Sequence, residues 1–387
     1  MDVFTTTITN KADFIDCFRE IEDMRDDDKL LYPLDEVLFL TVSAVLSYAE
    51  SWRQIYEFGK AKLEFLRQYF PYKHGIPKKS RICTLIGMID KKKFESWLIK
   101  WAQQLVDIIP KDIISVDGKA AKGSRTKENT AVHMLNVFAS KQGLVIGQKA
   151  IDSKTNEMKE TPKILDDLSI KGATVTIDAA GCYSDIIDKV VEKEADYFIR
   201  VKANQPQLLD AIKYIFKGKV NASTPDMDYH SQNNKGHGRK ECRRCWGTTF
   251  PDWLKDNYSK WNKLNSVYLV ESERHIGDKI SIEQKFYISS IKFKAKRGLE
   301  CSRTHWGIEN QLHHVLDVTF KEDHSQIHNA AENMSIIRKV ALNLAKLYKS
   351  NTKSKSSIPS IRKQTSWSTE VASNVLSYLF AKEGLAF

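Results

Sequence analysis

Three carboxylates occupy positions from which a folded chain could bring them together around metal ions. Asp117 closes the β-branched run ISVDGK, Asp178 closes VTIDAA, and Glu309 lies in the helical run HWGIENQLHHVLDV. Carboxylate oxygens are the ligands that hard divalent cations prefer, and two such ions can activate a nucleophile and stabilise the leaving oxygen of a phosphodiester. The pattern therefore predicts a site for two Mg²⁺ ions, with Mn²⁺ as a substitute, that acts on phosphodiesters.

Both aspartates follow the same local pattern. Alternation along a strand puts Asp117 on the face of Ser115, and it puts Asp178 on the face of Thr176, while the apolar neighbours point the other way. Glycine follows each acid within three residues, so the backbone can turn away and leave the carboxylate at the edge of a sheet. The alternative is that each aspartate only caps a following helix or turn.

Glu309 stands at the border between two faces of its expected helix. At about 100° per residue, one face is a buried apolar stripe, made of Ile308, Leu312, Val315 and Leu316. The adjacent face is a polar seam, made of Trp306, Asn310, His313 and Asp317. Core packing would hold Glu309 in place while its carboxylate faces a site. The alternative is an ordinary surface contact with His305 or His313.

The elements around these residues predict a mixed α/β sheet between helical segments. Residues 1–105 have helical periodicity, and 349–387 are expected to be a Ser/Lys-rich linker and one C-terminal helix. Residues 106–348 are expected to be one domain, with a β-rich insertion at about 215–295 and a helical segment after it. Strands are predicted at 113–118, 133–140, 143–151, 173–180 and 196–204.

The composition favours a polyanionic partner in a reducing compartment. Sixty Lys and Arg residues against 49 Asp and Glu residues give a formal net charge of +11. Six cysteines are too few for a disulfide scaffold in 387 residues, and the longest apolar run, 37–46, is about half of a membrane span. No signal sequence opens the chain, so the expected location is the cytoplasm.

Several basic and polar residues are candidate contacts for phosphate or bases. In YFIRVKANQ, alternation places Lys202 and Asn204 on one face, with Gln205 next to them. The run KGHGRKECRR, residues 235–244, is expected to be a basic loop whose His237 and Arg239 approach phosphate. Arg303 precedes Glu309 by six residues and could bind a phosphate. The alternatives are a solvated strand edge, a flexible charged loop and a charge at the start of a helix.

A zinc site is the competing metal hypothesis. Cys242 and Cys245, taken with Cys301 and His305, have the spacing of zinc ligands. A single CxxC in a basic, strand-prone stretch is weak evidence, and the second pair overlaps the start of a helix. We therefore favour the carboxylate site.

The motifs VDGKAAKGS, TIDAAGC, YFIRVKANQPQL, KGHGRKECR, FYISSI and RTHWGIENQLHHVLDVTFKED resemble, in order and spacing, the H repeat-associated insertion-sequence transposases. These belong to the DDE superfamily, and the similarity runs from about residue 30 to about residue 348. The sequence departs from the family at Lys122, where Arg is frequent, and at Tyr183, where Gln is usual.

The resemblance implies a function for the carboxylates and a partner for the basic residues. It implies an RNase H-like core with Asp117, Asp178 and Glu309 as catalytic triad, binding to terminal inverted repeats and target DNA, and action as an oligomer, expected to be a dimer. Metal-dependent cleavage at the ends of the element and strand transfer would be the reaction, in the bacterial cytoplasm at the nucleoid. Further DNA contacts are expected at residues that flank the three carboxylates: Lys119, Lys122, His305, Trp306 and Asn310. For Trp306 the simpler alternative is an aromatic ring that packs between helices.

Two other functions fit the same residues. One is an inactive or domesticated relative that binds the inverted repeats without cutting them. The other is a plain RNase H-like nuclease that needs no defined DNA ends. Because all three carboxylates and their flanking residues are intact, the sequence favours the transposase.

Overall fold

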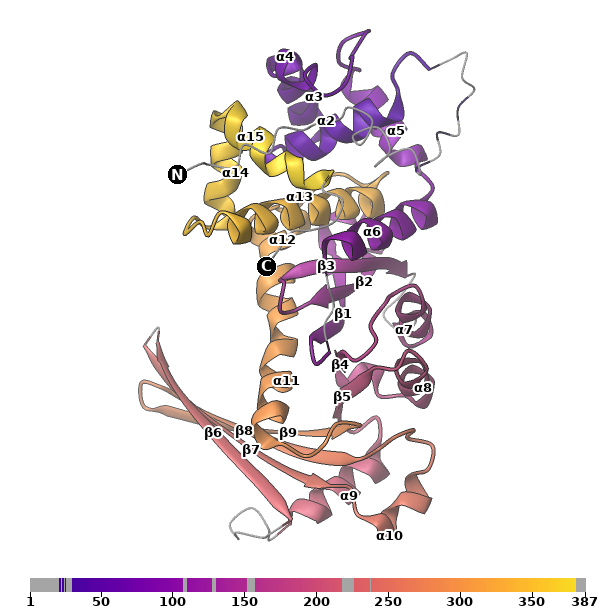
Figure 1. Ribbon diagram of the computed structural model, residues 1–387. Helices are drawn as coiled ribbons and strands as arrows, with labels where there is room; N and C mark the ends of the chain where they lie inside the picture. Colours follow the sequence, from indigo (N-terminus) through magenta and orange to yellow (C-terminus); the bar gives the residue numbers. More distant parts are fainter. Residues whose placement is uncertain are drawn as a thin grey trace.

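The computed structural model of the protein describes residues 30–106, 110–126, 130–151, 157–217, 226–236 and 238–380, together with residues 21, 23 and 25. The molecule has three parts along its length (Figure 1). A helical layer lies at one end, a sheet covered by helices lies in the middle, and a twisted arm of long strands lies at the other end.

Within the described residues, nine strands form one mixed sheet in the order β3-β2-β1-β4-β5-β9-β8-β7-β6. The pairs β1/β4 and β4/β5 are parallel, and the other neighbouring pairs are antiparallel. The central strands are β1 (Ile113–Ala121), β2 (Val132–Ala139), β3 (Leu144–Ile151), β4 (Thr174–Ile177) and β5 (Asp196–Val201). They lie where the sequence predicted strands, and the expected mixed α/β sheet is confirmed.

Helices cover both faces of this central part. The helices α7 (Glu157–Asp166) and α8 (Ser184–Glu192) pack on one face, and α11 (Ala295–Ile308) crosses the other (Figure 1). The side chains of Ile114, Val116 and Val175 are fully buried in the main core. Ser115 and Thr176 point to the opposite face, where the Thr176 hydroxyl lies 3.1 Å from that of Ser115. The predicted alternation of the two aspartate strands is therefore confirmed.

The arm consists of two long hairpins, which we call the β arm. Its strands are β6 (Met227–Gly236), β7 (Arg239–Thr249), β8 (Ser266–Ile276) and β9 (Lys279–Ser289), and β9 pairs with β5. The short helices α9 (Pro206–Phe216) and α10 (Asp252–Lys255) flank its base. A β-rich insertion was expected here, but the prediction of a loop at 235–244 was wrong. Most of that run belongs to the ends of β6 and β7, whose exposed charges hide the apolar alternation typical of strands.

The helical layer is built from both ends of the chain. Its first part contains α2 (Leu34–Leu46), α3 (Trp52–Ala61), α4 (Leu63–Leu66), α5 (Lys79–Met88) and α6 (Lys91–Leu105). The second part contains α13 (Ala331–Asn351), α14 (Ile358–Trp367) and α15 (Thr369–Leu376). Helix α14 occupies much of the stretch that the sequence predicted to be a linker. Ser357 caps this helix and Pro359 stands in its first turn, where proline is tolerated.

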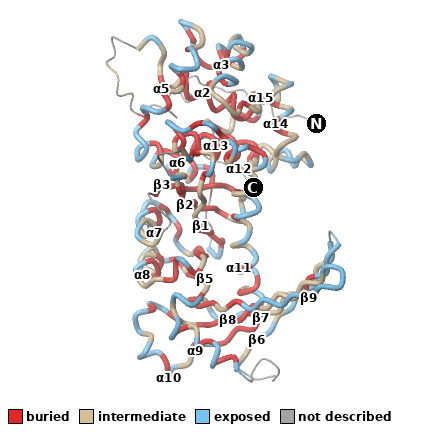
Figure 2. The backbone as a smooth tube through the Cα atoms, turned by 180° about the vertical axis from the view of Figure 1, so that it is seen from behind, coloured by how far each residue is buried: buried red, intermediate tan, exposed pale blue. Residues whose placement is uncertain are grey.

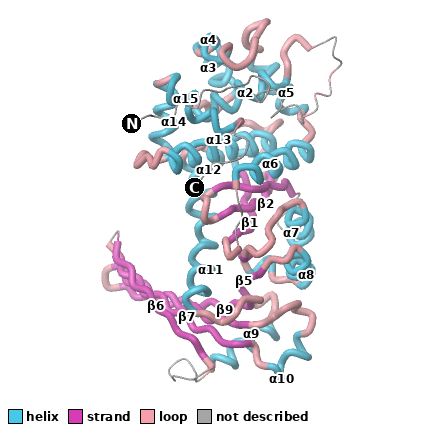
Figure 3. Tube along the Cα trace, in the orientation of Figure 1, coloured by secondary structure: helices cyan, strands magenta, loops and turns pink. Residues whose placement is uncertain are grey.

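Side chains cover the outer edge of the sheet at β3, where unpaired backbone groups would invite association. Asn343 of α13 bonds both the N–H and the C=O of Val145, and the Glu95 carboxylate accepts the N–H of Ala150 at 2.6 Å. Figure 2 shows buried residues concentrated in the sheet and the helical layer, while the tip of the β arm is exposed. Figure 3 shows the helices of this layer at the end of the molecule opposite the strands of the β arm. None of the helices in the described residues is long and apolar enough to span a membrane.

Candidate active site

Asp117, Asp178 and Glu309 line one cavity of about 70 Å³ on the α11 face of the sheet. Val116 and Ile177 form the last register pair of the parallel strands β1 and β4, so the two aspartates follow side by side on neighbouring strands. Strand β1 continues to Ala121, which means that Asp117 lies within the strand and not at its end as expected. The carboxylates meet at the point where the parallel pairing stops.

Glu309 enters the cavity from the end of α11. A π-helical turn, Glu309–His313, joins α11 to α12 (His314–Val318), and such turns are frequent at functional sites. Beneath it, Ile308, Leu312 and Leu316 are fully buried, whereas Glu309 itself is exposed. The buried stripe thus anchors the turn and leaves the carboxylate free to face the cavity.

The polar seam of this helix divides between two surroundings. His313 and Asp317 point toward β1, where His313 Nδ1 lies 3.6 Å from Asp117 Oδ2. Trp306 and Asn310 point toward the β arm instead. The sequence grouped these four side chains on one face. It did not indicate that two of them would face β1 and the other two the β arm.

Asp117 is a carboxylate that resists ionisation. Burial, together with the negative charges of Glu157, Glu309 and Asp178, raises its pKa to about 7. The neighbouring His313 supplies no positive charge, because its own burial lowers its pKa to about 3. A divalent cation in the cavity would favour the ionised form of Asp117 and offset the cost of burying its charge. The three carboxylates offer only oxygen atoms as ligands, which suits a hard ion.

Asp178 lies in the opposite electrostatic environment. Burial raises its pKa, but the Ala179 N–H bond and the charges of Lys202 and Arg200 outweigh that effect, and the pKa falls below its ordinary value. Lys202 Nζ lies 3.5 Å from Asp178 Oδ1. The two adjacent aspartates are therefore held with their pKa values moved in opposite directions.

His305 also lines the carboxylate cavity. Its Nδ1 lies 3.2 Å from the Thr176 hydroxyl, and burial lowers its pKa to about 4. The imidazole is neutral at physiological pH and holds α11 to β4 by a hydrogen bond.

Sequence reasoning missed two residues at this site, Glu157 and Arg200. Glu157, at the start of α7, lines a second small cavity with Asp117 and Asp178, and its Oε1 lies 2.5 Å from His133 Nε2. It approaches β1 so closely at Gly118 that a Cβ atom there would lie 2.0 Å from Glu157 Oε1. No pattern in the sequence links Glu157 to Asp117. Arg200 lines the carboxylate cavity, and the alternation that places it beside Lys202 could have identified it.

Lys119 and Lys122, which were predicted to contact DNA, form ion pairs with acids of the protein instead. Lys119 is 9% exposed and lies within 2.7–3.3 Å of the carboxylates of Asp317, Glu322 and Asp323. Burial opposes its charge, but these acids raise its pKa above the ordinary value. The exposed Lys122 lies 3.3 Å from Asp323 Oδ2.

Two predicted polar contacts stabilise the turn after Asp178. Asn204 donates to the Ala179 carbonyl and Gln205 to the Cys182 carbonyl, each at 2.8 Å. Both bonds fix the backbone that carries Asp178.

A groove of about 310 Å³ opens between α11 and the β arm beside the carboxylate cavity. Trp306 lines both of them, and Arg239, Arg303 and Asn310 line the groove. These four residues were predicted to contact DNA, and the fold brings them to one place. His237 was predicted with them but lies outside the described residues.

The zinc hypothesis is wrong for a geometric reason. Cys242 and Cys245 stand three residues apart on β7, so their side chains point to opposite faces of the β arm. Cys245 and Cys301 are buried against Tyr268 in an apolar cluster. In the part of the chain that the structure describes, no three His, Cys, Asp or Glu side chains are close enough to hold an ion together. Asp117, Asp178 and Glu309 line one cavity without forming such a close group.

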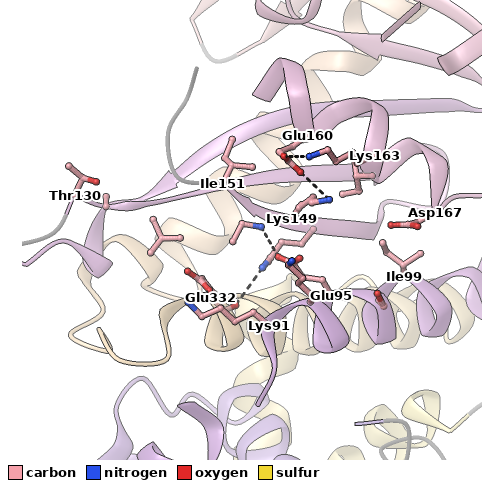
Figure 4. Close-up of a pocket in the computed structure, with 17 residues that line it drawn as sticks. Lys91, Glu95, Ile99, Thr130, Lys149, Ile151, Glu160, Lys163, Asp167 and Glu332 are labelled. Carbon is pink, nitrogen blue, oxygen red and sulfur yellow. Dashed lines mark hydrogen bonds and ion pairs between the residues drawn. The ribbon is translucent and has the colours of Figure 1, made fainter. Parts of the chain in front are cut away.

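A second cavity, of about 770 Å³, is separate from this site and lies between α6, β3 and α7 (Figure 4). Acids and lysines that pair with one another line it (Figure 4). Lys91 lies 2.6 Å from Glu332, and Lys149 lies 3.1 Å from Glu160. Several of its charges thus pair with one another, and none of the three predicted carboxylates contributes to it.

Comparisons with known proteins cover most of the chain. The family model described as "Transposase DDE domain" matches residues 109–344, and one described as "DDE_Tnp_1-associated" matches residues 15–102. YncI of Escherichia coli O157:H7, provisionally named a transposase, is 37% identical over 337 residues, which cover 85% of this chain and 86% of that protein. YhhI of Escherichia coli K12, provisionally named an H repeat-associated transposase, is 36% identical over 332 residues, covering 84% and 88%.

One solved structure is similar over most of the chain at low identity. It is a cryo-EM structure of the piggyBac transposase synaptic complex with hairpin DNA, 11% identical, with a TM-score of 0.43. The match covers 95% of this chain and 80% of that one.

Proposed function

Because the chain belongs to the family of DDE transposases, and within it to the H repeat-associated type, we propose that it cuts DNA at the ends of an insertion sequence and joins those ends to target DNA. The observation that carries this proposal is the single cavity lined by Asp117, Asp178 and Glu309, which come from positions far apart in the chain.

We assign the three carboxylates as metal ligands and catalytic residues. When bound there, Mg²⁺ or Mn²⁺, expected as two ions, would activate a water or a 3′-hydroxyl and stabilise the leaving oxygen. The neighbouring residues support this assignment. Buried Ile308, Leu312 and Leu316 hold the turn that carries Glu309, and Lys202 favours the ionised form of Asp178. Burial and the acids around it raise the pKa of Asp117, and a bound cation would favour its ionised form.

We further propose that the central strands form an RNase H-like core. The order β3-β2-β1-β4-β5, with β1, β4 and β5 parallel, supports this, as does the return of α11 across the sheet after the β-rich insertion. The partner in this proposal is double-stranded DNA, both the inverted repeats and the target, bound by a dimer. Residues 1–105 are expected to contribute to binding of the ends.

An oligonucleotide assay tests the proposal. Labelled duplexes taken from the DNA that flanks the gene are incubated with the protein and Mg²⁺, and strand cleavage and joining are measured. Asp117→Asn, Asp178→Asn and Glu309→Gln should each reduce cleavage by roughly three orders of magnitude or more, because each removes a metal ligand. Binding of the ends should stay near the wild-type level.

Asp210→Asn is the matched control, since this exposed acid of α9 lies away from the cavity, and it should cleave like the wild type. Wild-type protein that binds the ends but never cuts them would support the inactive, DNA-binding alternative. Degradation without preference for the ends would support the plain nuclease.

A further inference from the structure

The groove beside the carboxylate cavity is lined by positive charge from both of its walls. Strand register puts Arg239, Arg243 and Arg274 on the face of the β arm that looks toward α11, with Lys285 beside them. Arg303 of α11 comes from the opposite wall and donates to Gln232 of β6. Among the described residues that line the groove there is no acid. The surface of the groove is therefore cationic along its length.

Two acids on the same face of the β arm pair with some of these cations without neutralising all of them. Glu241, which is 5% exposed, lies 2.5 Å from Arg243 Nη2 and accepts a bond from Arg274 Nε at 2.9 Å. Glu283 lies 3.2 Å from Lys285. These two acids face the five groove cations, so a net positive charge remains for a ligand.

Arg243 has a donor that the protein leaves unused. Its Nη1 atom is buried and has no hydrogen-bond partner in the described residues. Burial lowers the pKa of Arg243, and although Glu241 opposes this, Arg303, Arg274 and Arg239 lower it further. A bound anion would satisfy the open donor and relieve the repulsion among the cations.

Trp306 connects the groove to the carboxylate cavity. Its ring lines both spaces, and Lys285 Nζ lies 4.3 Å from the ring centroid. A ligand that fills the groove would thus be continuous with one in the cavity. Phosphodiesters along one strand have this property, since the same anionic group repeats on both sides of a scissile bond.

We propose that this groove binds the sugar-phosphate backbone of the DNA strand whose scissile phosphate lies in the carboxylate cavity, with Arg243, Arg274 and Lys285 as phosphate contacts. This rests on the proposed function and adds to it a second phosphate-binding site. The β arm forms one wall of the path of the substrate. Backbone contacts carry no sequence information, so the groove would bind the cut strand whatever its sequence.

The two neighbouring arginines of β7 provide a matched test. Arg243 faces the groove, whereas Arg244 faces the other side of the β arm and lies 2.9 Å from Glu271 and 2.8 Å from Glu273. Affinity for a labelled duplex carrying an element end, and for a scrambled duplex, is measured by fluorescence anisotropy without divalent metal at several salt concentrations.

Arg243→Gln should weaken binding of both duplexes about tenfold and reduce the slope of log affinity against log salt by about one, as expected for one lost phosphate contact. Arg244→Gln should leave the affinity and the slope unchanged. Equal affinities and slopes for the two variants and the wild type would overturn the proposal.

A second variant covers the case in which Arg243→Gln fails to fold. Ser272 lies opposite Arg243 in the register of β7 and β8 and lines the groove. Ser272→Glu would give Arg243 an added acidic partner, which would compete with phosphate. The melting temperature should therefore stay near the wild-type value while DNA binding weakens. Unchanged binding by a folded Ser272→Glu protein would equally overturn the proposal.

Cleavage by the wild-type protein separates the two hypotheses. If it cuts the duplex with Mg²⁺ but Arg243→Gln binds like the wild type, the groove assignment fails and the proposed function stands. If it never cuts, yet Arg243→Gln loses affinity and salt dependence, the proposed function fails and the groove remains a DNA-binding site.

Discussion

At the scale of residues, two aspartates that stand side by side on neighbouring strands behave differently. Asp178 has a backbone N–H and Lys202 to favour its ionised form, whereas Asp117 has burial and three acids against it. The base that lies 3.6 Å from Asp117 is His313, which burial keeps neutral. Lys119, two residues away in sequence, forms ion pairs with Asp317, Glu322 and Asp323 instead. The electrostatic repulsion among the carboxylates of the site is therefore strongest at Asp117.

Binding of a divalent cation should reduce this repulsion and stabilise the fold. We expect Mg²⁺ or Mn²⁺ to raise the melting temperature of the wild type by a few degrees, measured by scanning calorimetry. The rise should be much smaller in Asp117→Asn, because this variant has lost a ligand and part of the repulsion. Asp210→Asn should keep the wild-type response. An equal rise in Asp117→Asn and the wild type would count against a metal site at these carboxylates.

At the scale of elements, the edge strand β3 depends on side chains from helices far away in the chain. Asn343 and Glu95 bond backbone groups that a further strand would otherwise occupy. Burial raises the pKa of Glu95 to about 7, although the Ala150 N–H and Lys149 act in the opposite direction. The folded state therefore holds a proton on Glu95 more tightly than the unfolded state does.

This gives a pH dependence of stability with a defined sign. As the pH rises from about 4.5 to about 7, the unfolded chain ionises Glu95 first, and the folded state loses stability. Glu95→Gln removes the charge but keeps an oxygen for the Ala150 N–H. We expect this variant to have the stability of the wild type at about pH 4 and to be more stable than the wild type by about 3 kcal/mol above about pH 8.

Urea unfolding of both proteins across this pH range measures the difference. Glu57→Gln, at an exposed position of α3, should show no such trend. A constant difference between Glu95→Gln and the wild type at all pH values would contradict the assignment.

At the scale of the whole molecule, the two ends of the chain fold together into one helical layer. Arg362 of α14 is fully buried, donates to the carbonyls of Val45 and Thr319, and lies 4.2 Å from the ring centroids of Tyr48 and Phe320. Tyr69 and Trp101 bond to Ser373 and the Leu379 carbonyl on the other side of the layer. The stability of the first helices therefore depends on the last ones.

Arg362→Met should destabilise the protein by about 3 kcal/mol, because it leaves two buried carbonyls without donors. Lys363→Met is the control, since this neighbouring side chain is exposed and should change stability by less than about 0.5 kcal/mol. Denaturant unfolding, monitored by circular dichroism and by tryptophan fluorescence, measures both. Similar unfolding midpoints for Arg362→Met and the wild type would show that the two ends are not coupled through Arg362.

The sequence by itself determined the local elements and the candidate carboxylates. Period-two alternation identified the aspartate strands and the buried face of each, and helical periodicity identified the stripe of Ile308, Leu312 and Leu316, because burial acts residue by residue along one element. It failed for β6 and β7, where charged side chains replace the apolar alternation, and for α14, which lies in a Ser/Lys-rich stretch and is held to the first helices by the buried Arg362.

Only the tertiary structure decided which distant residues meet. It brought Glu157 against Gly118, directed Lys119 to internal acids, and placed Arg243, Arg274 and Lys285 across a groove from Arg303. No periodicity records these contacts, because they are set by strand order, register and the path of α11 across the sheet. The reason is physical: a side chain's neighbours within an element follow from spacing, but its charge environment sums over every element that packs against it.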